Sequence, residues 1–124
     1  MPSPVYALFA EAMIERKQIL CDYDGLPREL CSILLGHSDR REVALAYQFA
    51  GGGKSPLPSR GQWKCLFLSK VRVARLRVGA RYAGASHERP QSCVKLVDLD
   101  ANPQSAYAPR RRIPSRPRPR KRRD

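Results

Sequence analysis

The last fifteen residues form a strongly basic segment, and their composition predicts that they lie outside the folded part of the chain. Residues 110–124 hold nine Lys or Arg, one Asp and three prolines, a net charge of +8 out of a formal +13 for the chain. A segment with so much like charge and so little apolar material cannot bury enough surface to offset its ordering entropy. We therefore expect a single domain over residues 1–103 and a disordered basic tail over 104–124.

The N-terminus and the hydropathy pattern predict a cytoplasmic protein. No apolar run approaches the roughly 18 residues that span a bilayer. The first residues lack a basic region, and Glu11 and Glu15 interrupt their apolar side chains, which is not typical of a secretory signal. Without export, we expect the four cysteines to be reduced thiols, mostly buried.

The first half of the chain predicts one helix followed by strands. Ser3-Pro4 is a favourable helix start, and apolar residues recur at helical spacing over about 4–15. Residues 18–23 are rich in apolar and aromatic side chains and end at Asp24-Gly25, a turn sequence. Residues 28–35 fit either a short helix or a buried strand, and we expect a polar turn over 36–41.

The second half predicts further short strands. Large and small side chains alternate over 42–50, which is typical of a strand with two distinct faces. Strands are also expected at 62–68 and 93–99, with loops over 51–61 and 79–91. In residues 70–78 the apolar positions change phase, which predicts a bulge near Val73. The fold class expected is α+β, an N-terminal helix followed by a small, strongly curved antiparallel sheet of the Sm- or SH3-like barrel type.

The order of these segments resembles a WYL domain, the Sm-like barrel of many bacterial transcriptional regulators. The family's helix and first strand are similar to AEAMIERKQILCDYDG, and its Arg-bearing strand to RELCSILLG from Arg28. Glu42-Val43-Ala44 stands where the family has Trp-Tyr-Leu, and Phe67 replaces the Arg of a later motif. The resemblance implies an isolated sensory or oligonucleotide-binding barrel without the family's helix-turn-helix. It implies ligand contacts at Arg28, Tyr47 and Lys70.

The residues that could carry catalysis or hold a metal are better explained by core packing and loop structure. Cys31, His37, His87 and Cys93 could supply a zinc site if they met in space, but no CxxC pair occurs, and buried cysteines pack as small hydrophobes. The run from Gly51 to Ser55 lacks the first glycine of a phosphate-binding loop. We expect no metal, no cofactor and no catalysis.

Basic residues interleaved with aromatic ones predict contact with DNA or RNA. On a small barrel, such residues can hold phosphates and unstacked bases, and a cationic arm adds a contribution that is independent of sequence. The alternative is a domain that senses a small ligand or a protein without contacting nucleic acid. The residues expected at the nucleic-acid interface are Trp63, Lys64, Lys70, Arg72, Arg75, Arg77, Arg110, Arg111, Arg112, Arg116, Arg118, Arg120, Lys121, Arg122 and Arg123.

Overall fold

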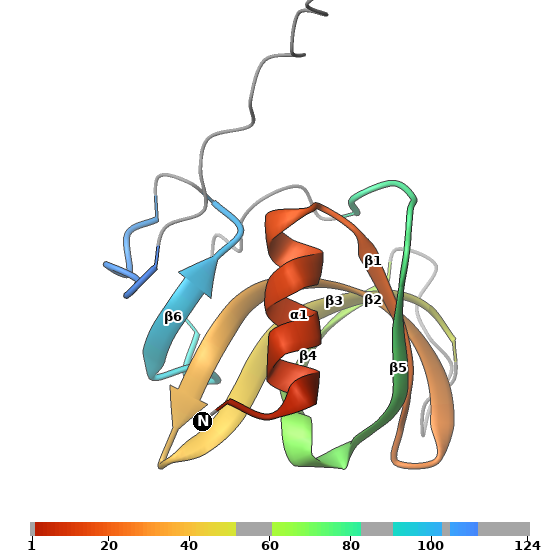
Figure 1. The fold of residues 1–124 in the computed structure, drawn as a ribbon, viewed down its shortest axis with the longest axis horizontal. Coiled ribbons are helices and arrows are strands. Elements are labelled where there is room, and N and C mark those ends of the chain that lie inside the picture. Colours follow the sequence, from red (N-terminus) through yellow and green to blue (C-terminus); the bar gives the residue numbers. More distant parts are fainter. Residues whose placement is uncertain (1, 52–60, 83–90, 103–104, 112–124) are drawn as a thin grey trace, which may run out of the picture.

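The computed structural model describes residues 2–51, 61–82, 91–102 and 105–111. One N-terminal helix lies against a six-stranded antiparallel sheet, so the expected α+β class is confirmed (Figure 1). The elements are α1 (Pro4–Ile14), β1 (Gln18–Tyr23), β2 (Leu26–Ser38), β3 (Arg41–Gly51), β4 (Gln62–Phe67), the short 3-10 helix η1 (Leu68–Lys70), β5 (Val71–Arg77) and β6 (Leu96–Asp100). No helix within these described ranges is long and apolar enough to cross a membrane.

Helix α1 begins as its sequence predicts. The side chain of Ser3 accepts a hydrogen bond from the Tyr6 backbone N–H at 3.1 Å, and Pro4 is the first helical residue. The backbone N–H of Ser3 in turn donates to Glu42 on β3 at 2.9 Å, which ties the start of the helix to the sheet.

Strand β2 organises the sheet. β3 pairs along one edge of β2, while β1 and β6 share its other edge, at residues 26–30 and 34–37 respectively. The ambiguous segment 28–35 is therefore strand, buried on both faces. The turn expected over 36–41 is shorter than predicted, because His37 and Ser38 pair with β3 and leave only Asp39-Arg40 in the turn.

The sheet is strongly curved but does not close into a barrel. β4 and β5 lie at the two ends of the strand order, yet only the three residues of η1 join them. The four Cα–Cα steps from Phe67 to Val71 span at most about 14 Å, so the two edges must bend toward each other. The Phe67 N–H at the end of β4 donates to the Tyr23 hydroxyl of β1 at 3.0 Å, but within the described residues β4 and β5 form no ladder.

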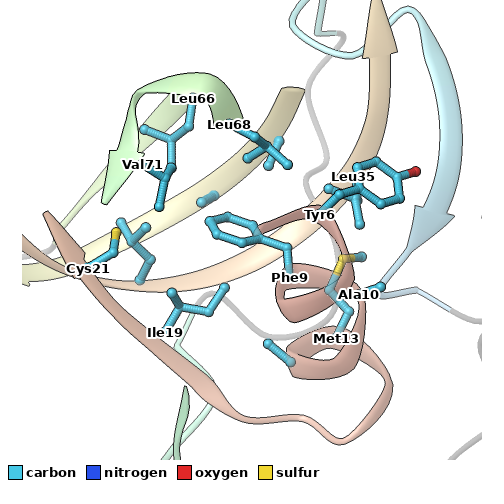
Figure 2. Packing of buried hydrophobic residues seen from close by; sticks show 14 of the residues in the cluster. Tyr6, Phe9, Ala10, Met13, Ile19, Cys21, Leu35, Leu66, Leu68 and Val71 are labelled. Carbon is cyan, nitrogen blue, oxygen red and sulfur yellow. The ribbon is translucent and has the colours of Figure 1, made fainter. Parts of the chain in front are cut away.

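Both faces of the sheet are covered. Phe9 and Met13 of α1 point into a cluster with side chains of β1, β4 and β5 (Figure 2). The predicted alternation in β3 is confirmed: Ala44 and Ala46 belong to this cluster, whereas Val43 and Leu45 pack on the other face with Val94 and Val97. Small residues on β3 therefore face the core that α1 covers, and large ones pack against the segment that leads into β6.

Candidate nucleic-acid interface

A β-bulge at Val73 decides which side chains β5 presents to solvent. Leu20 of β1 pairs with Arg75, but Asp22, two residues later, pairs with Arg72, three residues earlier on β5. The extra residue is Val73, whose φ of 52° lies in the left-handed region that β-branched residues avoid. The bulge predicted from the phase change is confirmed. It brings Arg72 onto the same face as Arg75 and Arg77, which we call the arginine face.

The three side chains of the arginine face are held to different degrees. Arg77 donates to Gln18 Oε1 at 2.8 Å and to Glu29 Oε1 at 2.6 Å, an ion pair near the surface. Arg72 donates to the carbonyl oxygens of Ser69 at 2.7 Å and Val71 at 3.0 Å. Arg75 is exposed and has no hydrogen bond or ion pair to the described residues. All three guanidinium groups keep donors available for phosphate oxygens.

A groove of about 330 Å³ adjoins the arginine face where the bulge interrupts the ladder. Its lining includes Arg75 and Arg77, the apolar side chains of Leu20 and Val73, and the inward-facing Arg28. Arg28 is only 6% exposed and donates to Gln48 Oε1 at 3.1 Å and to the Tyr23 carbonyl oxygen at 3.2 Å. Its Nε–H has no partner among the described residues.

The thiol of Cys21, also at this groove, is not a nucleophile at neutral pH. Burial raises its pKa to about 11, against the opposing effect of the nearby Arg28 charge. A buried protonated thiol packs as a small hydrophobe, because the thiolate is the reactive form. The groove therefore offers cationic and apolar groups for binding.

The ligand contacts implied by the family resemblance do not form one site. Arg28 lies over the Tyr23 ring, whereas Tyr47 packs edge-on against Trp63 with ring centroids 5.3 Å apart. Lys70, in η1, lies over the Phe67 ring. No hydrogen bond, ion pair or ring contact joins any two of these three described residues.

Trp63 and Lys64 are not part of the arginine face. They lie on β4, at the opposite end of the strand order from β5. As neighbours in a strand they point to opposite sides: Trp63 pairs with Tyr47, and Lys64 with the core residue Ala46. Arg81 also lies outside the arginine face: it donates to the backbone carbonyls of Lys17 and Ser32, and burial lowers its pKa.

The first residues of the basic tail dock on the domain. The backbone N–H groups of Arg110 and Arg111 donate to the carbonyls of Val97 and Asp98 at 3.2 and 2.8 Å. The Arg111 guanidinium donates to Asp98 Oδ2 at 3.0 Å, and Arg110 lies 3.6 Å from Asp98 Oδ1. The expectation of a free arm from residue 104 is thus wrong for these two residues. The tail residues from Arg112 onward lie outside the described residues.

Asp98 is a buried carboxylate that joins the helix, β6 and the start of the tail. The Tyr6 hydroxyl donates a hydrogen bond to it. Burial, followed by this bond to Asp98, raises the pKa of Tyr6 well above its ordinary value. No local pattern marks Asp98 as important, because its three partners come from two distant segments.

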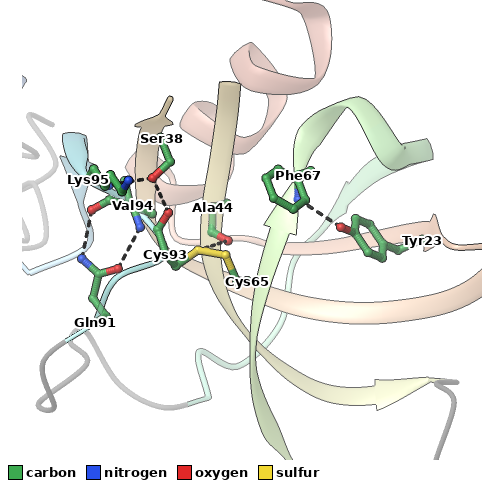
Figure 3. Close-up of a disulfide and its surroundings, with 9 residues drawn as sticks. All are labelled: Tyr23, Ser38, Ala44, Cys65, Phe67, Gln91, Cys93, Val94 and Lys95. Carbon is green, nitrogen blue, oxygen red and sulfur yellow. Dashed lines mark hydrogen bonds between the residues drawn. A yellow bond between two sulfur atoms is a disulfide. The ribbon is translucent and has the colours of Figure 1, made fainter. Parts of the chain in front are cut away.

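The expectation that all four cysteines are reduced is wrong. Cys65 of β4 forms a disulfide with Cys93, and the two Cα atoms lie 5.7 Å apart (Figure 3). The sequence predicts a strand over residues 93–99, but β6 begins only at Leu96. Cys93 therefore lies in the segment before β6. Cys21 and Cys31 are free and buried, as expected. Sequence reasoning missed the pair because 28 residues separate its members and no local spacing links them.

The candidate zinc ligands do not meet within the described residues. Cys93 is in the disulfide, Cys31 is buried near the Ala80 carbonyl, and His37 stacks on Tyr6 with ring centroids 5.5 Å apart. His87 lies outside the described residues. Within them, no group of three or more potential ligands gathers.

Comparison with known proteins adds no relatives. No family model matches the chain, and neither a curated protein nor a solved structure matches it. The function must therefore be argued from the residues themselves.

Proposed function

We propose that this protein is a non-catalytic nucleic-acid-binding module that contacts phosphates through its arginine face. The observation that carries the proposal is the bulge at Val73, which places Arg72, Arg75 and Arg77 on one side of β5. Without the extra residue, Arg72 would face the opposite way, so a local distortion produces the cluster. Arginine forks match phosphate oxygens in geometry as well as charge.

The charge of the whole chain supports the same partner. A formal net charge of +13 attracts polyanions over long range, and the C-terminal segment holds much of it. Asp98 engages Arg110 and Arg111, so we propose that the later basic residues supply most of the tail's contribution.

The curved sheet is consistent with the Sm-like barrels that the sequence resembles. The very short connection η1 between the two edge strands supports this relationship, as does the pairing of β5 with β1. We propose the relationship at the level of fold. A regulatory role is a further proposal that rests on the resemblance alone. A cytoplasmic location is proposed from the N-terminal sequence, and the Cys65–Cys93 disulfide counts against it.

The test compares Arg75 with Arg40, two exposed arginines at different places on the sheet. Binding of labelled DNA and RNA oligonucleotides is measured against salt for the parent chain, Arg75→Gln and Arg40→Gln. Arg40 is exposed in the β2–β3 turn, at the far end of β2 from the groove. A chain that neutralises six to eight phosphates should give a slope of about −4 to −7 in log K against log salt.

We expect Arg75→Gln to weaken binding and flatten that slope by about one phosphate, whereas Arg40→Gln leaves both nearly unchanged. Equal effects of the two substitutions would show that only net charge matters. Undetectable binding at low salt would refute the proposed function.

A further inference from the structure

The groove beside the arginine face is lined by residues of β1, β2 and β5 next to the bulge. Cys21 falls between Leu20 and Asp22, the two paired positions of β1 that flank the register shift, and has no partner in the ladder with β5. Cys21 and Arg28 pair with each other across β1 and β2 and face inward, yet both line the groove together with outward-facing Leu20. The groove beside the bulge is therefore lined by residues that belong to both faces of the sheet.

Arg28 at this groove is a buried cation without a counter-charge. It is 6% exposed, and no carboxylate of the described residues forms an ion pair with it. Its two hydrogen bonds go to neutral acceptors, and its Nε–H is unpartnered. Burying a guanidinium in this way is costly unless an anion approaches, because neutral oxygens replace only part of its lost hydration.

The lining also includes two carboxylates, Asp22 and Glu29, and Glu29 is neutralised by its ion pair with Arg77. The remaining surface suits a flat, partly apolar group. Leu20, Pro27 and Val73 supply apolar surface, and Val73 is 75% exposed at the rim. Arg75 adds an exposed guanidinium that can bind phosphate or stack on a ring. The volume of about 330 Å³ is at the lower end of the roughly 300–1,000 Å³ typical of small-ligand sites.

We propose that this groove holds one unstacked nucleotide of a single-stranded nucleic acid, an inference that rests on the proposed function of the arginine face. The phosphate lies against the exposed guanidinium of Arg75, the buried charge of Arg28 attracts it from beneath the groove, and the base lies on the apolar wall formed by Leu20 and Val73. A duplex keeps its bases stacked and paired, so it can contact the arginine face but cannot insert a base. The structure thus predicts a preference for single strands, which the charges alone would not produce.

The experiment fills the groove without changing charge. Leu20→Trp places a large ring in the groove, and Leu96→Trp is the matched control, because Leu96 is 68% exposed on β6 and does not line the groove. Affinities for a labelled twelve-nucleotide strand and for the same sequence as a duplex are measured at fixed salt on the full chain. Melting temperatures establish that both variants are folded.

We expect Leu20→Trp to weaken single-strand binding by about tenfold, the lower range for loss of one stacked base, and to change duplex affinity less than twofold. Leu96→Trp should change neither. If Leu20→Trp fails to fold, Arg28→Met tests the same site, because it removes a buried cation that has no carboxylate partner among the described residues and keeps a long apolar side chain.

The other outcomes separate this inference from the proposed function. If groove-filling leaves single-strand binding intact, or weakens strand and duplex equally, the nucleotide site is refuted while phosphate binding by the arginine face stands. If adenosine monophosphate binds the parent chain at micromolar concentration and Leu20→Trp abolishes that binding while strand binding stays intact, a free nucleotide is the ligand and the single-strand site is refuted. If neither strand nor duplex binds the parent chain, both proposals fail.

Discussion

At the scale of single residues, Asp98 makes folding stability depend on pH. Burial raises the pKa of this carboxyl, but hydrogen bonds from Tyr6 and Arg111, with the charges of Arg111 and Arg110, outweigh burial and hold the pKa below its ordinary value. A carboxyl whose pKa is lower in the folded chain contributes stability that is complete above the unfolded pKa of about 3.9. That contribution is lost as the pH falls from there through the lower folded pKa.

We expect Asp98→Asn to lower the urea midpoint at pH 7, and the difference from the parent chain to shrink as the pH falls from about 4 toward 2. Asp39→Asn is the control, because the Asp39 side chain is 79% exposed and pairs only at the surface with Lys95. It should have little effect at any pH in this window. A constant difference between parent and Asp98→Asn down to pH 2 would contradict the role assigned to the charged carboxylate.

At the scale of elements, the segment 105–111 behaves as part of the domain. We expect the full chain with Arg110→Gln and Arg111→Gln to melt about 5–10 °C lower than the parent, since a buried carboxylate that loses its partners costs about 1–2 kcal/mol. Truncation after Ala108 should lower the melting temperature at least as much. Arg122→Gln with Arg123→Gln, which removes the same charge, should leave the melting temperature unaltered. If this control variant also melts about 5–10 °C lower, net charge rather than contact with Asp98 explains the effect.

Most elements could be predicted because their signals are local. The Ser3-Pro4 start of α1, the Asp24-Gly25 turn and the alternation in β3 each depend on neighbours in sequence, and each is confirmed. The bulge could also be predicted, because a strand whose apolar positions change phase must gain or lose a residue. Only part of the predicted nucleic-acid interface lies on the arginine face, because Trp63 and Lys64 of β4 lie at the other end of the strand order.

The errors share a different cause, which is contact between distant segments. β2 extends past Gly36 because β3 and β6 pair with it, and no turn signal in residues 36–41 reveals that. The Cys65–Cys93 bond and the docking of Arg111 on Asp98 likewise join segments whose approach depends on the finished fold. That buried Arg28 has no carboxylate partner among the described residues also appears only when its surroundings are known.

At the scale of the whole molecule, the disulfide closes a loop of 28 residues. We expect dithiothreitol to lower the free energy of unfolding by about 3–4 kcal/mol, because reduction restores conformational entropy to the unfolded chain. The Cys65→Ser, Cys93→Ser double variant should match the reduced parent and be insensitive to the reagent. A parent chain whose urea midpoint is unchanged by dithiothreitol would contradict this assignment.

The same bond makes η1 and β5 part of a covalent ring that begins at β4 and ends just before β6. A peptide bond cut anywhere inside that ring yields two pieces that remain one molecule until the sulfur bridge is reduced. The arginine face lies within the ring. After a cut in the ring, the chain on each side of the cut therefore stays covalently linked to the rest of the protein, either through the backbone or through the disulfide. New chain ends can therefore be introduced there without releasing the strand that carries the proposed function.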